Sequence, residues 1–191
     1  MTEHLVPLPL SRRGQRWAFL LLLGVAGMWL LGLYAHQTLP EQVPVHFGWK
    51  GTPTRYGDKT AFAFLPFAFS IAPMVLFLIT RYRFTLINRY PYLINLPAFY
   101  TSLWRLPPER RSLWVNRYFE GILGLGAFLS LYLLGLEYGI YMGTKTGHLP
   151  LWFTPVALVA PLFLLIPWVF YLVKLSREMA QEAERYSSET S

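Results

Sequence analysis

The chain has 191 residues, no cysteine and a formal net charge of +7. Hydrophobic residues make up 54% of it and charged residues only 14%, whereas soluble domains are about 25% charged. These values exclude a disordered tail, a disulfide-linked scaffold and a cysteine-type zinc module. Charges are missing from four long windows and crowded between them, which is typical of a protein that crosses a membrane several times.

The basic residues lie beside these apolar windows, and this position decides between two interpretations of the positive charge. A basic soluble protein often binds nucleic acid through phosphate contacts. Arginines that flank apolar windows are instead typical of membrane topology and of contact with anionic lipid. We therefore expect a phospholipid bilayer as the partner and no nucleic acid.

Each apolar window is long enough to cross the bilayer core, which needs about 20 helical residues. The windows comprise residues 17–35, 61–80, 118–142 and 149–173. No small-residue cleavage site follows the first window, so we interpret it as a retained anchor rather than a signal peptide. The sequence predicts an all-α integral membrane protein with four transmembrane helices.

The distribution of Lys and Arg predicts the orientation of these helices. Thirteen of the 17 basic residues lie in residues 1–16, in the 81–117 connection or after residue 173. The positive-inside rule then places both termini and the 81–117 connection in the cytoplasm of a bacterial inner membrane. The connections at 36–60 and 143–148 face outward.

This topology divides the chain into five consecutive parts. They are a cytoplasmic segment (1–16), a two-helix unit (17–80) with its outward loop (36–60), a cytoplasmic loop (81–117), a second two-helix unit (118–174) and a cytoplasmic tail (175–191). The 81–117 loop contains several prolines, which prevent one continuous helix. We expect it to form short interfacial helices whose arginines face lipid phosphate, or a surface that docks a partner.

The outward loop carries the most specific pattern in the sequence. Apolar and polar residues alternate from Gln42 to Lys50, which predicts a short β segment with one apolar face. Gly48, Gly51, Pro53 and Gly57 then indicate a compact turn region.

The residues of this loop resemble a bacterial family. The run Leu39-Pro40, Pro44-x-His46-Phe47, Gly51, Tyr56 and Lys59 is similar to the signature of the domain of unknown function 1648, which follows the first membrane helix of its proteins. Thr54 stands where the family usually has aspartate, so Asp58 is a candidate to replace that acid. The resemblance implies a partner-binding role for Pro44, His46, Phe47, Gly51, Tyr56 and Lys59. Proteins with this module include SdpI-like immunity proteins, which neutralise a secreted toxic peptide and hold a repressor at the membrane.

Two further patterns lie within the third window. Glu137 is an ionisable residue in a membrane span, with Ser130 and Tyr141 on its side of the helix, and such residues are functional candidates. The alternative is that Glu137 only reaches water at the outer headgroups. Gly135, Gly139 and Gly143 form a repeated G-x-x-x-G ridge, which suits packing within the chain or contact in a homodimer.

The sequence contains none of the nucleotide-binding, metalloprotease or serine-hydrolase motifs. His46, His148 and Glu137 are weak candidates for a metal site, because they lack motif spacing. We therefore expect a non-enzymatic membrane protein without cofactor, whose outward loop binds a peptide, lipid or protein in immunity or signalling. The alternatives are an accessory subunit of a larger membrane complex and a membrane-embedded metal-dependent enzyme.

Overall fold

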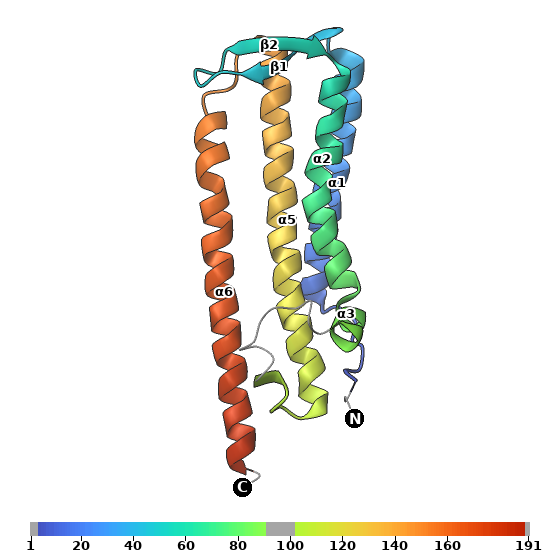
Figure 1. Cartoon of the computed structure of the whole chain (residues 1–191), viewed down its shortest axis with the longest axis vertical. Helices are drawn as coiled ribbons and strands as arrows, with labels where there is room; N and C mark the ends of the chain where they lie inside the picture. The colour runs from blue at the N-terminus through green and yellow to red at the C-terminus, as the bar shows by residue number, and fades with distance from the viewer. Residues whose placement is uncertain (1–3, 91–101, 190–191) are drawn as a thin grey trace.

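In the computed structural model, which describes residues 4–90 and 102–189, four long helices run side by side (Figure 1). They are α1 (Arg12–Thr38), α2 (Thr60–Arg81), α5 (Pro108–Thr146) and α6 (Phe153–Glu189). A short helix, α3 (Arg83–Arg89), follows α2. A two-stranded hairpin of β1 (Gln42–Phe47) and β2 (Pro53–Asp58) connects α1 to α2 in the chain and lies across one end of the bundle.

Residues with clear local preferences mark where the long helices begin and end. The Ser11 hydroxyl accepts a hydrogen bond from the Gly14 amide (3.2 Å) and caps the start of α1. Pro108 occupies the first turn of α5, where no intrahelical donor is needed. Gly147 ends the same helix with φ +76°, a left-handed conformation that glycine adopts without steric cost.

The four long helices confirm that each predicted span is helical over most of its length. Each is long and apolar enough to cross a membrane. The windows 17–35, 61–80 and 118–142 lie inside α1, α2 and α5, whereas α6 begins four residues after the start of its window. Figure 1 places the start of α1 and the end of α6 at one end of the bundle, called here the terminal end, and the hairpin at the other, called the hairpin end. The compartment that each end faces stays a prediction.

The interior of the bundle lies between α1, α2 and α5. Leu21, Met28 and Ala35 recur every seven residues along α1 and are fully buried. Gly24 of α1 lies so close to α5 that a Cβ there would overlap the Ser130 hydroxyl. By contrast, no residue in the most apolar window of α6 is buried. The bundle is therefore a three-helix core with α6 packed along one side.

Two helices extend past the predicted segment boundaries at the terminal end. Residues 108–117 continue α5 instead of forming an interfacial helix, and α6 continues to Glu189. Arg110 pairs with Glu182 at 2.7 Å and Arg117 with Glu178 at 3.0 Å, so α5 and α6 stay joined beyond the apolar windows. Of the expected short helices, α3 is present, and residues 91–101 lie outside the described part of the chain.

The expectation that the arginines of this loop face lipid is wrong for Arg83. Its guanidinium is buried and donates to Asn116 Oδ1 (2.7 Å) and to the carbonyls of Thr80 (2.9 Å) and Leu8 (2.6 Å). Asn116 in turn donates to the Pro9 carbonyl at 2.6 Å. A buried guanidinium is stable only when its donors are satisfied, and here the backbone of the N-terminal segment provides one of the acceptors.

Candidate functional site

The loop after α1 forms an antiparallel hairpin, so the expected β segment is present and has a second strand that was not predicted. Pro44 lies opposite Tyr56, but His46 lies opposite Arg55, because a bulge interrupts the register between them. The bulge breaks the predicted two-residue alternation. Pro44, which the alternation places on the polar face, is buried, and Trp49, which it places on the apolar face, lies in the turn beyond β1 and is 90% exposed.

The tip of the hairpin is fastened to the turn between α5 and α6. Gly51 has φ +75° and accepts a hydrogen bond from the Leu149 amide at 2.8 Å. A side chain at Gly51 would be strained by this φ and would crowd the imidazole of His148. The motif glycine therefore has a structural role, which is to hold the hairpin down on the bundle.

The histidine of the motif contacts the residue at which this chain departs from the family pattern. His46 Nδ1 and Thr54 Oγ1 are hydrogen-bonded at 2.6 Å, and the same hydroxyl lies 3.3 Å from the His46 carbonyl, to which it donates. Thr54 thus provides a neutral partner where the family usually has an acid. Nε2 of His46 has no hydrogen-bond partner among the described residues.

Three other charged residues of the loop, Glu41, Asp58 and Lys59, make contacts at the base of the hairpin. Lys59 Nζ pairs with Glu41 Oε1 at 2.7 Å, and the Lys59 amide donates to the Glu41 carbonyl at 3.0 Å. Asp58 accepts a hydrogen bond from the Thr60 amide at the start of α2 (2.8 Å), which lowers the pKa of this exposed carboxyl. Asp58 therefore satisfies a backbone amide at the start of α2, and its carboxyl forms no hydrogen bond or ion pair with His46 or Lys59.

A pocket of about 320 Å³ lies where β1 meets the ends of the helices. Three motif residues line it, namely Pro44, His46 and Phe47. The remaining lining residues are apolar side chains from α2, α5, the turn between α5 and α6, and the start of α6: Ala61, Phe62, Leu65, Ile140, Leu149 and Phe153, together with Val45 from β1. Tyr56, which belongs to the outer strand, is 60% exposed and does not line this pocket.

None of the helix residues in this wall was predicted as a site residue. They come from segments up to about a hundred positions apart, and no local pattern marks them. The bulge between Pro44 and His46 was the missed local feature, because it breaks the alternation that assigned these residues to faces of β1, and both of them line the pocket.

The polar seam predicted on α5 is inside the bundle. Ser130, Glu137 and Tyr141 are all buried, and Glu137 is 0% exposed, so the alternative that it reaches headgroup water is wrong. Neither carboxyl oxygen of Glu137 has a hydrogen-bond partner among the described residues. Ser130 donates to the Ala127 carbonyl at 2.9 Å, and the Tyr141 ring packs against Tyr34 and Phe62.

Two of the three glycines of the ridge, Gly139 and Gly143, lie against other parts of the same chain. A Cβ at Gly139 would overlap the rings of Trp152 and Phe153, and one at Gly143 would overlap Leu149. Gly135 differs, because no atom of another residue lies where its Cβ would be. The ridge therefore lets the turn into α6 lie against α5.

Over residues 4–90 and 102–189, no three His, Cys, Asp or Glu side chains are grouped as a metal site would require. His46 is held at the hairpin by Thr54 and His148 lies beside Gly51, while Glu137 is buried within the bundle. The weak metal candidates are thus not brought together.

The fold defines a four-helix membrane protein with a hairpin fastened across one end. A family model described as a domain of unknown function (DUF1648) matches residues 23–69, which run from α1 through the hairpin into α2. An uncharacterized protein of Archaeoglobus fulgidus is 45% identical over 182 residues, which cover 94% of this chain and 98% of that protein. The chain belongs to this family, which confirms its resemblance to the domain of unknown function 1648. No solved structure is significantly similar to it.

Proposed function

We propose that the protein is a non-enzymatic membrane protein whose hairpin end binds a peptide or a segment of a partner protein. The pocket beneath the hairpin is the observation that supports this proposal most directly. Its walls come from the hairpin, α2, α5 and the start of α6, and three motif residues contribute to them. An occupant would therefore contact several structural elements at once.

The chemistry of the pocket favours one apolar group with a polar group beside it. Apart from His46 its walls are apolar, and its volume of about 320 Å³ lies at the small end of ligand pockets. His46 is oriented by Thr54 and keeps Nε2 for a partner. This arrangement suits an apolar side chain followed by a main-chain or polar group that hydrogen-bonds the imidazole.

The outer strand favours a peptide over a lipid. In the described part of the chain β2 pairs only with β1, so its other edge keeps unpaired backbone groups. An extended peptide can add to such an edge through main-chain hydrogen bonds. A lipid tail would leave these groups without partners.

Photo-crosslinking from position 49 tests this function, because Trp49 is exposed beside the pocket-bearing strand. In native membranes we expect a discrete crosslinked partner, which disappears when Ile140→Trp fills the pocket. The matched control is Leu131→Trp on the exposed side of α5. No crosslinked product, or equal products from both variants, would overturn the proposal.

A role in immunity or signalling is the specific form of this function that we propose from the family resemblance. A deletion strain would then be more sensitive to an extracellular toxic peptide, and the wild-type gene would restore resistance while the Ile140→Trp variant would not. Unchanged sensitivity to a panel of secreted peptides would remove the immunity role.

An accessory subunit of a larger membrane complex is the second candidate, and the exposed apolar side of α6 supports it. Leu158, Leu162 and Phe163 are more than half exposed there. Native mass spectrometry from mild detergent separates the two candidates. An accessory subunit should be purified together with a second protein chain, and the Ile140→Trp variant should still be purified with that chain.

A further inference from the structure

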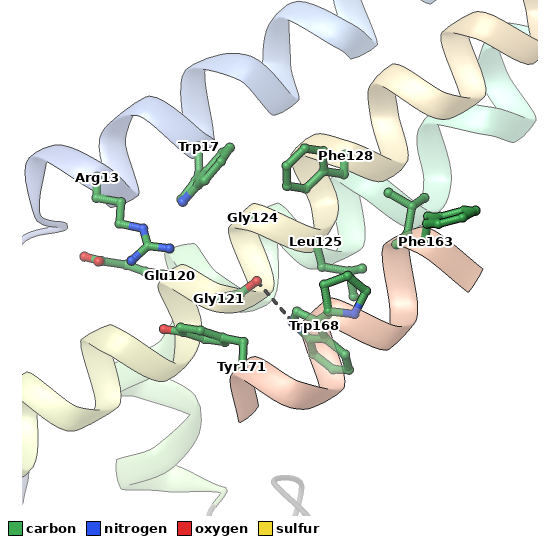
Figure 2. Close-up of a pocket in the computed structure, with 12 residues that line it drawn as sticks. Arg13, Trp17, Glu120, Gly121, Gly124, Leu125, Phe128, Phe163, Trp168 and Tyr171 are labelled. Carbon is green, nitrogen blue, oxygen red and sulfur yellow. Dashed lines mark hydrogen bonds between the residues drawn. The ribbon is translucent and has the colours of Figure 1, made fainter. Parts of the chain in front are cut away.

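A second cavity of about 360 Å³ lies nearer the terminal end, between α1, α5 and α6 (Figure 2). Apolar and aromatic side chains form most of its walls, and the aromatic ones are Trp17, Phe128, Phe163, Trp168 and Tyr171. It is separate from the pocket beneath the hairpin, with which it shares no residue. The proposed binding at the hairpin end uses none of its residues.

Contacts between helices hold the walls of this cavity in place. Trp168 donates from Nε1 to the Gly121 carbonyl (3.2 Å), and the Tyr171 hydroxyl donates to the Arg117 carbonyl (2.8 Å). A Cβ at Gly121 would overlap the Tyr171 ring, so the glycine allows α6 to approach α5 here. Farther up α5, a Cβ at Gly124 would make only ordinary contact with Trp17, at 3.6 Å. The close approach of α5 and α6 at Gly121 thus forms one side of an apolar cleft, whose other lining residues come from α1 and from the following turns of α5.

Arg13 places a cation at the mouth of this cleft. Its guanidinium carbon lies 5.9 Å from the centre of the Tyr171 ring, and Figure 2 shows the side chain reaching from α1 toward the cleft below Trp17. Arg13 is exposed and makes no ion pair or hydrogen bond in the described part of the chain. It is therefore available to an anion outside the protein.

The other charges near the mouth are already engaged. Glu120 accepts hydrogen bonds from the Ser11 amide and hydroxyl, both at 2.8 Å, and Figure 2 shows its carboxylate directed away from the cleft. Arg117 pairs with Glu178 at 3.0 Å, and Lys174 lies 3.9 Å from the other oxygen of Glu178. Among these groups Arg13 alone combines a free positive charge with an apolar cleft behind it.

We propose that this cleft binds one anionic phospholipid, with an acyl chain between α1, α5 and α6 and the phosphate on Arg13. A basic residue at the end of a cleft between membrane helices is suited to a lipid phosphate. The aromatic rings of Trp17, Trp168 and Tyr171 are suited to the boundary between chains and headgroups. The outer helix surfaces contact the bilayer in general, whereas this site binds one lipid molecule. The proposal holds whichever compartment the terminal end faces.

The test uses the full chain in mild detergent, with phosphatidylglycerol or phosphatidylcholine added in equal amounts and retained lipid counted by native mass spectrometry. We expect one phosphatidylglycerol to be retained about tenfold more than phosphatidylcholine, which corresponds to one charge-assisted contact. Arg13→Gln should remove this preference. The adjacent Arg12→Gln, which is exposed and does not line the cleft, should keep it.

Two further measurements locate the lipid within the cleft. Leu125→Trp, at a position that lines the cleft, should reduce retention of phosphatidylglycerol, while inorganic phosphate should not displace the lipid. Equal retention of the two lipids by the wild type would overturn the proposal, as would equal effects of Arg12→Gln and Arg13→Gln. Displacement by inorganic phosphate alone would show a simple anion site instead.

Discussion

His46 and Thr54 face each other across the hairpin, with 2.6 Å between the imidazole Nδ1 and the threonine hydroxyl. The contact joins a residue of the family pattern to the residue at which this chain departs from that pattern. It orients the imidazole at the mouth of the pocket, because one ring nitrogen is held and the other is left for a partner.

Removal of this hydrogen bond should loosen the hairpin without unfolding the bundle. Thr54→Val keeps the side-chain shape and removes the hydroxyl. Because the contact is exposed, we expect a loss of about 0.5–1.5 kcal/mol of local stability. Hydrogen exchange of the β1 and β2 amides would then accelerate, and Thr52→Val, at the exposed tip, should leave it unchanged. Equal exchange in both variants would show that the contact does not hold the hairpin.

Two buried carboxyl groups on α5 should respond differently to replacement by the neutral amide of glutamine. Glu120 accepts two hydrogen bonds from Ser11, so Glu120→Gln should lower the free energy of unfolding by about 1–3 kcal/mol. Glu137 has no hydrogen-bond partner among the described residues, and Glu137→Gln removes an unpaired ionisable group. We expect Glu137→Gln to be at least as stable as the wild type. Thermal unfolding in detergent compares the two, and a larger loss for Glu137→Gln would contradict this account.

Arg83 should not be replaceable by lysine. Its guanidinium bonds three acceptors at once, and a single ammonium cannot reproduce that planar geometry. We expect Arg83→Lys to cost about 2–4 kcal/mol and to free the segment around Leu8, since charged hydrogen bonds are lost in a buried site. Limited proteolysis of residues 4–10 measures this release. Arg81→Lys at a nearby exposed position is the control and should stay resistant.

The terminal ends of α5 and α6 should separate more readily in acid. The Arg110 guanidinium donates to Glu182 and lowers the pKa of that carboxyl. A lowered pKa in the folded state means that the stabilisation is complete above the ordinary pKa of glutamate and is lost as the pH falls through the lower value. Because the pair is partly exposed, the effect should not exceed about 1 kcal/mol.

The measurement for this pair is the melting temperature between pH 3 and pH 6, a range that brackets the ordinary pKa of glutamate at about 4.3. Glu182→Gln should flatten the acid side of the curve. Glu184→Gln, a neighbouring carboxyl with no ion pair in the described part of the chain, should leave the curve as in the wild type. An unchanged curve for Glu182→Gln would show that the pair contributes nothing.

Local sequence patterns determined the membrane helices and the position of the motif. Windows of about 20 apolar residues can satisfy their backbone groups in a bilayer only as helices, so hydropathy alone predicts them. The spacing of Pro44, His46 and Phe47 identified the family before any contact was known, and the family match over residues 23–69 confirms it. The side of the membrane that each end faces, also inferred locally from Lys and Arg, remains a prediction.

Only the tertiary structure decided which of these residues share a site. The wall formed by Leu65, Ile140 and Phe153 under the hairpin depends on how α2, α5 and α6 pack together. The hydropathy pattern along the sequence does not predict that packing. The burial of Arg83 and the isolation of Glu137 have the same origin. Hydropathy depends on each residue and its neighbours along the chain, whereas the partner of a buried charge is set by segments that are distant in sequence.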